Sequence, residues 1–224
     1  MIRARIKDPR DISRLYSRLS RIYDLFTDHE PRHHREAVAL GAIRAGDAVL
    51  EVAVGTGRAL PDIARGVGEH GRVCGLDLTG AMLKVAGAKL KRQGLHQKVE
   101  LARGSAFSLP YQDGKFDVVY NAYMLDLIDS PQIPGVLLEF KRVLKPGGEI
   151  ILVNMSKNTE KKTLFEFLYE QGLVTYGNCR PVLGEPWVKQ AGFENIRRIY
   201  RRNFSWFRLN LLAGTEIVIA DKPG

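Results

Sequence analysis

The stretch Ala48-Val-Leu-Glu-Val-Ala-Val-Gly-Thr-Gly57 decides the fold class of this chain. A short apolar run of strand length ends at two closely spaced glycines, and a helical pattern follows over residues 60–67. The order strand, glycine turn, helix is typical of a parallel sheet whose crossovers are helices.

The same order recurs further along the chain. Apolar runs at residues 72–78, 99–101, 116–120 and 149–153 predict strands, and helices are expected after Thr79 and after Ser130. Strands that alternate with helices predict a parallel sheet covered on both faces. Short strands at residues 196–204 and 215–220 have little sequence between them, so they are expected to pair antiparallel.

The N-terminal segment predicts two helices, at residues 8–26 and 31–43. The first is amphipathic and basic, which fits either a helix packed on the core or a flap that covers a substrate or touches a membrane. Further helices are predicted at residues 160–172 and 186–191.

Composition identifies an ordinary globular chain rather than a disordered or fibrous one. The 224 residues are 45% hydrophobic and 26% charged, and the net charge of +9 favours anionic partners without choosing among them. Cys74 and Cys179 are far apart, so no disulfide framework is expected. The chain has no stretch of about 20 apolar residues, and a cytoplasmic location is expected.

The glycine turn and an acid at the end of the second strand indicate a nucleoside site. Gly55 and Gly57 allow a ligand to approach the backbone, and the Asp77 carboxylate can accept both hydroxyls of a ribose. A dinucleotide site shares this spacing, but it needs a third small residue where Leu60 stands. The sequence therefore contains only part of the pattern that a dinucleotide site requires.

Four motifs in order resemble the class I S-adenosylmethionine-dependent methyltransferases. They are residues 49–57, residues 75–83, residues 104–111 with 116–119, and residues 142–148. Tyr23-Asp24 is similar to a pair in the quinone-biosynthesis C-methyltransferases and the bacterial phospholipid N-methyltransferases. The resemblance implies a Rossmann-like, doubly wound α/β fold with a mostly parallel seven-stranded sheet, an antiparallel C-terminal strand and N-terminal helices.

The resemblance also implies one domain over 1–224, with a helical cap (1–45), a cofactor-binding core (46–155) and a substrate-side part (156–224). S-adenosylmethionine is the implied cofactor. Its contacts are carried over to Glu51, Ala53, Gly55, Gly57, Asp77, Leu78, Met82, Ser105, Ala106 and Asn121. Two positions depart from the family: Ala53 replaces the usual first glycine, and Ser105 replaces an aspartate that accepts from the adenine amine.

Catalysis needs a base when the acceptor atom is carbon or oxygen. Candidates are Tyr23 and Asp126 first, then His29, His33, His34 and Tyr123. Adjacent histidines on a helix diverge, and no Cys/His set has metal-ligand spacing, so no metal is expected.

A small or amphiphilic acceptor is expected, such as a lipid amine, a quinol-like molecule or another small molecule. The chain lacks paired prolines after Asn121, which argues against DNA and protein amides as substrates. It also lacks the late glycine-rich signature of the quinone enzymes. Arginines and aromatics over residues 197–208 fit an anionic membrane surface, RNA, or a solvated strand face. An RNA methyltransferase and a noncatalytic nucleotide-binding module remain the alternatives, and the oligomeric state is left open.

Overall fold

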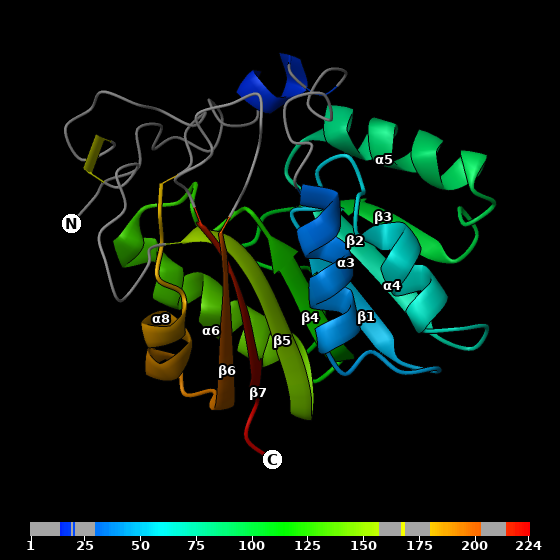
Figure 1. Cartoon of the computed structure of the whole chain (residues 1–224). Helices are drawn as coiled ribbons and strands as arrows, with labels where there is room; N and C mark the ends of the chain where they lie inside the picture. Colours follow the sequence, from blue (N-terminus) through cyan, green and yellow to red (C-terminus); the bar gives the residue numbers. More distant parts are fainter. Residues whose placement is uncertain (1–13, 19, 21–29, 157–166, 169–179, 203–213) are drawn as a thin grey trace.

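The computed structural model describes residues 14–18, 20, 30–156, 167–168, 180–202 and 214–224 (Figure 1). The strands are β1 (Ala48–Val52), β2 (Arg72–Asp77), β3 (Val99–Arg103), β4 (Phe116–Ala122), β5 (Leu144–Ser156), β6 (Glu194–Arg202) and β7 (Gly214–Asp221). The helices are α3 (Glu30–Leu40), α4 (Leu60–Gly66), α5 (Gly80–Arg92), a 3-10 turn η1 (Ser130–Gln132), α6 (Ile133–Val143) and α8 (Glu185–Gln190).

The strands form one seven-stranded sheet in the order β3-β2-β1-β4-β5-β7-β6. The first five strands in this order pair parallel, and β7 is antiparallel to both β5 and β6. The predicted doubly wound sheet with an antiparallel C-terminal strand is confirmed. Because the order reverses between β1 and β4, the connections that follow these two paired strands lead to opposite faces of the sheet and leave room for a ligand between them.

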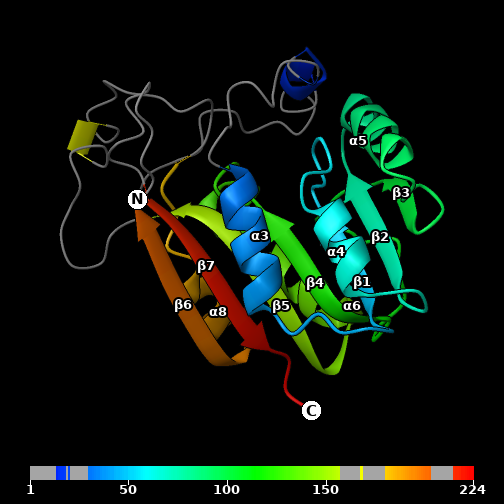
Figure 2. The same cartoon turned by 45° about the vertical axis from the view of Figure 1, so that its right-hand side comes forward.

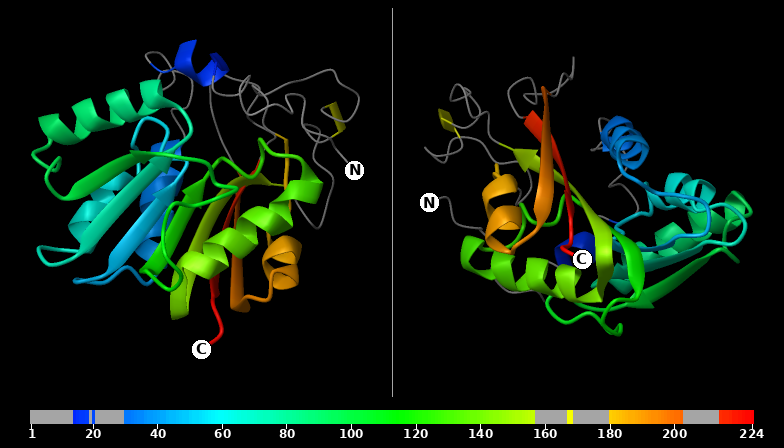
Figure 3. Two further views of the ribbon diagram at one scale, coloured as in Figure 1. Left: turned by 180° about the vertical axis from the view of Figure 1, so that it is seen from behind. Right: turned by 90° about the horizontal axis from the view of Figure 1, so that it is seen from below.

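Helices cover both faces of the sheet. Helices α3, α4 and α5 lie on one face, as Figure 2 shows, and α6 and α8 lie on the other, as Figure 3 shows from behind. Each face has its own apolar core, with Ala37, Ile63 and Leu90 in the first and Ile133, Leu137 and Val188 in the second. None of the described helices is long and apolar enough to cross a bilayer.

Predicted element boundaries differ from the structure where the chain contacts the sheet. The helix expected over residues 31–43 ends at Leu40, and Gly41, which follows it, lies so close to β5 that a Cβ there would clash with the Ile151 side chain. The helix expected after Ser130 begins as the turn η1. Of the first predicted helix, residues 14–18 are helical, and most of the helix predicted over 160–172 lies outside the described residues.

Three of the C-terminal arginines bind carboxylates of the fold itself. Arg198 Nε lies 2.6 Å from Glu216 Oε2, Arg201 Nη2 lies 2.7 Å from Glu36 Oε1, and Arg197 Nη2 lies 3.7 Å from Glu149 Oε2. These ion pairs attach β6 to β7, α3 and β5. Burial raises the pKa of Glu216, while Arg198 and the amide of Gly184 act in the opposite direction. The aromatic residues 204, 206 and 207 and Arg208 lie outside the described residues.

We predict that Arg198→Leu lowers the free energy of unfolding by about 3–5 kcal/mol, because it leaves Glu216 as a buried, unpaired carboxylate. The Arg198 and Glu216 side chains are 12% and 0% exposed. Arg201→Leu is the matched control on the same strand: its pair is 44% and 22% exposed, so the loss should be below about 1 kcal/mol. Urea unfolding measures the free energy of unfolding of both variants. Equal losses would contradict the conclusion that the buried pair contributes more to stability than the exposed one.

Candidate functional site

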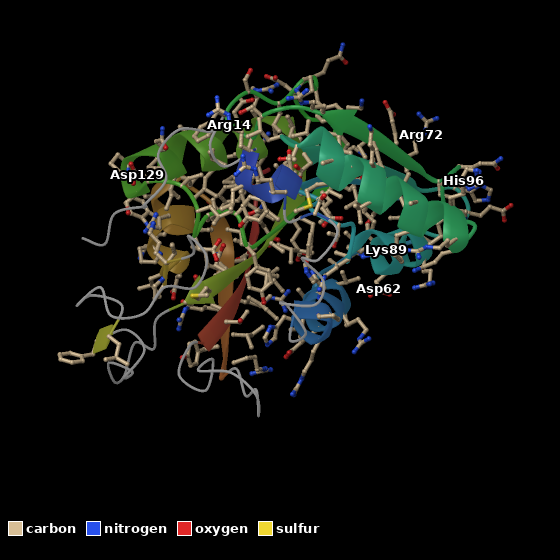
Figure 4. All side chains as sticks on the ribbon, turned by 90° about the horizontal axis from the view of Figure 1, so that it is seen from above. Arg14, Asp62, Arg72, Lys89, His96 and Asp129 are labelled. Carbon is tan, nitrogen blue, oxygen red and sulfur yellow. The ribbon has the colours of Figure 1, made fainter. Side chains whose placement is uncertain are left out.

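A cleft opens at the carboxyl ends of β1, β2 and β4, where the sheet order reverses. Its empty space, counted together with open solvent at its mouth, is about 1180 Å³. Figure 4 views the molecule from this side and shows Asp129, which lines the cleft, opposite Lys89 of α5 and Asp62 of α4. Most of the predicted cofactor residues line it: Glu51, Ala53, Gly55, Asp77, Leu78, Met82, Ser105 and Ala106.

The carboxylate of Asp77 holds the glycine turn in place. Its Oδ2 accepts from the Gly55 amide at 2.8 Å, and its Oδ1 accepts from the Thr79 amide at 2.7 Å. Burial raises the pKa of Asp77, and these backbone hydrogen bonds oppose the rise. The side chain thus fixes the ends of β1 and β2 and also presents a carboxylate to the cleft.

The two glycines of the turn serve different purposes. Gly55 has a φ of +56°, and a Cβ there would meet nothing within 4 Å, so its backbone is open to the cleft. Gly57 has a φ of +75°, and a Cβ there would lie 2.9 Å from Ala86 Cβ of α5. Gly57 is not on the cleft wall, and its role is the close packing of the turn against α5.

Ala53 carries backbone strain at the start of the turn. Its φ is +61°, in the left-handed region that favours glycine. This is the position at which the sequence departs from the glycine of the family that it resembles, and an alanine adopts this conformation with more strain than a glycine.

Glu51 supplies a second carboxylate to the same end of the cleft. It is 2% exposed, and its Oε2 accepts no hydrogen bond from any described residue. Burial raises the pKa of Glu51 well above its usual value, the nearby Asp77 raises it further, and Lys89 acts against both. A buried carboxylate oxygen without a partner is suited to a cationic or hydrogen-donating ligand.

The far side of the cleft is apolar and fits a planar base. Met82 is almost fully buried in α5 while it also lines the cleft, so it serves both the core and the wall. Ser105 Oγ accepts from the Phe107 amide at 3.2 Å, and Leu78 and Ala106 complete this side.

Asn121 and Asp126 lie behind the wall rather than on it. Asn121 is fully buried and donates from Nδ2 to the Val52 carbonyl at 2.8 Å, which joins β4 to β1 beneath the turn. Asp126 is also fully buried, and its carbonyl accepts from the Arg180 amide at 3.1 Å. The residues that follow it, Leu127, Ile128 and Asp129, line the cleft.

Of the remaining candidate bases, the structure brings two to the cleft: His34 of α3 and Tyr123, which follows β4. His33 is buried behind Tyr123, with Nδ1 at 2.9 Å from Tyr123 Oη. Tyr23 and His29 lie outside the described residues, but Tyr16 from the same N-terminal segment lines the cleft. The described residues include no group of three or more side chains that could hold a metal ion.

Comparison with known proteins identifies the family. A model described as a methyltransferase domain matches residues 49–148. The demethylmenaquinone methyltransferase of Lactococcus lactis subsp. lactis is 34% identical over 179 residues, spanning 80% of this chain and 67% of that protein. The chain belongs to the class I S-adenosylmethionine-dependent methyltransferases, in their quinone-biosynthesis group.

One further relative agrees with this membership, and one solved structure shares the fold. The 2-phytyl-1,4-naphthoquinone methyltransferase of Synechococcus elongatus is 32% identical to our methyltransferase over 154 residues, 66% of this chain and 65% of that protein. The cyclase SpnF has a TM-score of 0.77 over 96% of this chain and 97% of its own, at 17% identity, which shows a shared fold alone. The chain is therefore a methyltransferase that uses S-adenosylmethionine.

We predict that Ala53→Gly raises the free energy of unfolding by about 0.5–1 kcal/mol, because relief of left-handed strain exceeds the added entropy of the unfolded chain. Ala88→Gly is the control: Ala88 is an exposed residue inside α5, and there the same change should cost about 1 kcal/mol. Urea unfolding of both variants tests the opposite signs. Equal destabilisation by the two changes would show that Ala53 is unstrained.

Proposed function

We propose that this enzyme transfers a methyl group from S-adenosylmethionine to a ring carbon of a reduced naphthoquinone. The two relatives above are named for methylation of naphthoquinones. The observation that carries the proposal is an apolar wall, formed by Leu127, Ile128 and Met124, in the same cleft as Glu51 and Asp77. Such a wall suits a fused aromatic ring and a hydrophobic tail.

The described residues fit the cofactor. In the proposal Glu51 accepts from its ammonium group, and Asp77 accepts from its ribose hydroxyls. Leu78 and Met82 pack on its adenine, and Ser105 with the backbone of Ala106 lies beside the ring edge. The sulfonium supplies an electrophilic methyl group, and the residues of the cleft bind, orient and exclude water around it.

Ser105 weakens one of these contacts. An uncharged hydroxyl accepts a weaker hydrogen bond than the aspartate of the family, since charge-assisted bonds are about twice as strong. Ser105 Oγ already accepts from the Phe107 amide. We therefore propose a looser adenine contact than the family pattern provides.

Asn121, Asp126 and Gly57 act indirectly in this proposal. Asn121 fixes the β1 end to β4, Gly57 seats the turn on α5, and Asp126 lies in the segment that Arg180 ties down through the Ile128 carbonyl. All three position cleft-lining residues without reaching the cleft themselves.

The other acceptors have less support. The arginines expected to contact RNA or lipid headgroups are engaged in ion pairs at three of the described positions. The relatives above do not support a lipid amine. A noncatalytic nucleotide-binding module would use the same acid pair to bind its ligand, and the relatives above, which are named as methyltransferases, do not support it. The missing glycine-rich signature argued against quinone acceptors, and the names of the relatives outweigh it.

The proposal includes the predicted division of the chain into a cap, a cofactor-binding core and a substrate-side part. Tyr16 on the cleft wall supports residues 1–45 as a cap over the cleft, beside the core 46–155 and the substrate-side part 156–224. Peripheral contact with an anionic membrane, where a hydrophobic quinol would be found, and a cytoplasmic location remain predictions. Tyr23 remains a predicted catalytic residue.

We predict that S-adenosylmethionine affinity rises with pH through the raised pKa of Glu51. Protonated Glu51 must lose its proton to face a cationic ligand, so binding releases a proton and weakens as the pH falls. Calorimetry in buffers of different ionisation enthalpy measures this release. Glu51→Gln should abolish it and weaken binding, whereas Glu185→Gln, an exposed residue of α8, should leave both unchanged.

The same substitution has a consequence for stability. Because the pKa of Glu51 is raised by folding, the ionised carboxylate destabilises the ligand-free protein as the pH rises above the pKa of the unfolded chain. Glu51→Gln should therefore raise the melting temperature at pH 8 more than at pH 5. A rise that is independent of pH would contradict the assignment.

The acceptor class is tested with labelled S-adenosylmethionine and a chemically reduced, short-tailed 1,4-naphthoquinone lacking the ring methyl group. We predict methyl incorporation on carbon, with no transfer to phosphatidylethanolamine vesicles or to total RNA. Asp77→Ala should lose at least about tenfold in S-adenosylhomocysteine affinity, equal to about 1.4 kcal/mol. Transfer to RNA or lipid amine, but not to the naphthoquinol, would overturn the proposed acceptor.

A further inference from the structure

Two adjacent histidines of α3 each bind a tyrosine of the central sheet region. His33 Nδ1 lies 2.9 Å from Tyr123 Oη, and His34 Nδ1 lies 2.7 Å from Tyr120 Oη. Both imidazoles are buried, at 4% and 6% exposure. They therefore have the same chemical type, nearly the same burial and the same kind of partner.

The cleft distinguishes between them. His34 lines the cleft and His33 does not. Tyr120 is fully buried and lies outside the cleft wall, so the Nδ1 edge of His34 is turned towards the sheet. Nε2 is the ring nitrogen on the other side of the imidazole from that bond, and His34 is the histidine of the pair that reaches the cleft wall.

From this geometry we infer that His34 is the general base that takes the hydroxyl proton of the acceptor, an inference that rests on the proposed function. Tyr120 acts as a positioning residue that fixes the imidazole through Nδ1. A base held by a third group is the usual arrangement for proton transfer at a nucleophile.

The surroundings of His34 are rigid. Tyr120 lies in β4, which pairs with both β1 and β5. The Tyr123 ring meets the His34 ring edge-to-face at a centroid distance of 5.9 Å. Tyr123 itself has a φ of +51°, and its Oη lies 3.4 Å from Thr215 Oγ1. A strained residue held from several sides at a cleft wall is typical of a functional site.

Charged and titratable groups surround the imidazole of His34. The groups that line the cleft with His34 are Glu51 of β1, Asp77 of β2, Arg58 of the turn, Asp129, Tyr16 and Tyr123. Tyr120 is its hydrogen-bond partner, and His33 and Arg35 are its neighbours in the α3 sequence.

The proposed step balances in atoms and charge. The acceptor O–H bond breaks and its proton passes to His34 Nε2. The ring carbon next to the resulting phenolate forms a bond to the methyl carbon, whose bond to sulfur breaks with its electron pair remaining on sulfur. The ring carbon then loses its hydrogen as a proton to water, and the methylated phenolate takes back the proton held by His34.

The experiment compares His34→Asn with His33→Asn in the full-length chain. Asparagine keeps a polar atom near the place of Nδ1, so each variant retains a partner for its tyrosine, and melting temperatures check the fold. We expect His34→Asn to lower kcat with the naphthoquinol by at least 100-fold with little change in KM, and to remove the acid limb of the kcat–pH profile between pH 5 and 8.

Expected results for the control variants differ in kind. His33→Asn should keep the acid limb, whatever its absolute rate, because its imidazole does not face the cleft. Tyr120→Phe should lower kcat while the acid limb remains at a shifted pH, because the base is present but less well oriented. An acid limb that survives in His34→Asn, or one lost in His33→Asn, overturns the inference.

A second measurement is independent of turnover. The probe 4-nitro-1-naphthol changes its absorption when it ionises, and it is titrated into the protein loaded with S-adenosylhomocysteine. Wild-type protein and His33→Asn should increase the ionised fraction of bound probe, and His34→Asn should not. Equal ionisation in all three proteins refutes His34 as the base, whereas absence of binding to wild type refutes the proposed acceptor class.

Discussion

The Asp77 carboxylate is the interaction on which the site depends. It accepts two backbone amides, one from the glycine turn after β1 and one from the start of α5. A buried carboxylate is costly unless hydrogen bonds satisfy it, so these amides stabilise the charge while the charge fixes the turn. Asn121 adds a bond from β4 to the last residue of β1. Three strand ends are therefore held together directly beneath the cleft.

Backbone strain accumulates where these strand ends meet the cleft. Ala53 follows β1 and Tyr123 follows β4, and both have positive φ values. Val52 and Asn121 are register partners, so the two strained residues leave the paired strands at nearly the same level. Both strained residues line the cleft. The Val54 amide donates to the Leu76 carbonyl and the Tyr123 amide donates to the Val153 carbonyl, and these hydrogen bonds help to hold the strained backbone.

The sequence predicted those parts of the molecule that local patterns determine. The β1 turn, the place of Asp77 at the end of β2 and the alternation of strands and helices follow from apolar runs and glycines that are close in the chain, and the structure has these elements. The base could not be selected in this way. His33 and His34 are adjacent, and only the packing of α3 on β4 shows which imidazole faces the cleft. Asn121 was expected at the cofactor, but the register of β1 and β4 directs it to the Val52 carbonyl.

The arginines of β6 illustrate the same limit. Their spacing with aromatic residues resembles a surface for anions, yet Arg198 binds a fully buried carboxylate of β7 and Arg201 binds Glu36 of α3, which is distant in sequence. A charge pattern is a local property, and the partner of each charge depends on the sheet order.

The low polarity of the cleft has a direct consequence for the proposed chemistry. A phenolate and a sulfonium are opposite charges that disappear together when the methyl group moves. Water stabilises both ions strongly, so a water-filled site would favour the separated reactants over the transition state in which charge is already diminished. The wall of Leu127, Ile128 and Met124 excludes that water, while Glu51 and Asp77 hold polar groups of the cofactor away from the reacting atoms. The base must then form the phenolate inside the cleft. This requires a proton acceptor that is fixed in an apolar wall rather than one at the surface. Among the described candidates, His34, which is hydrogen-bonded to Tyr120, meets that requirement.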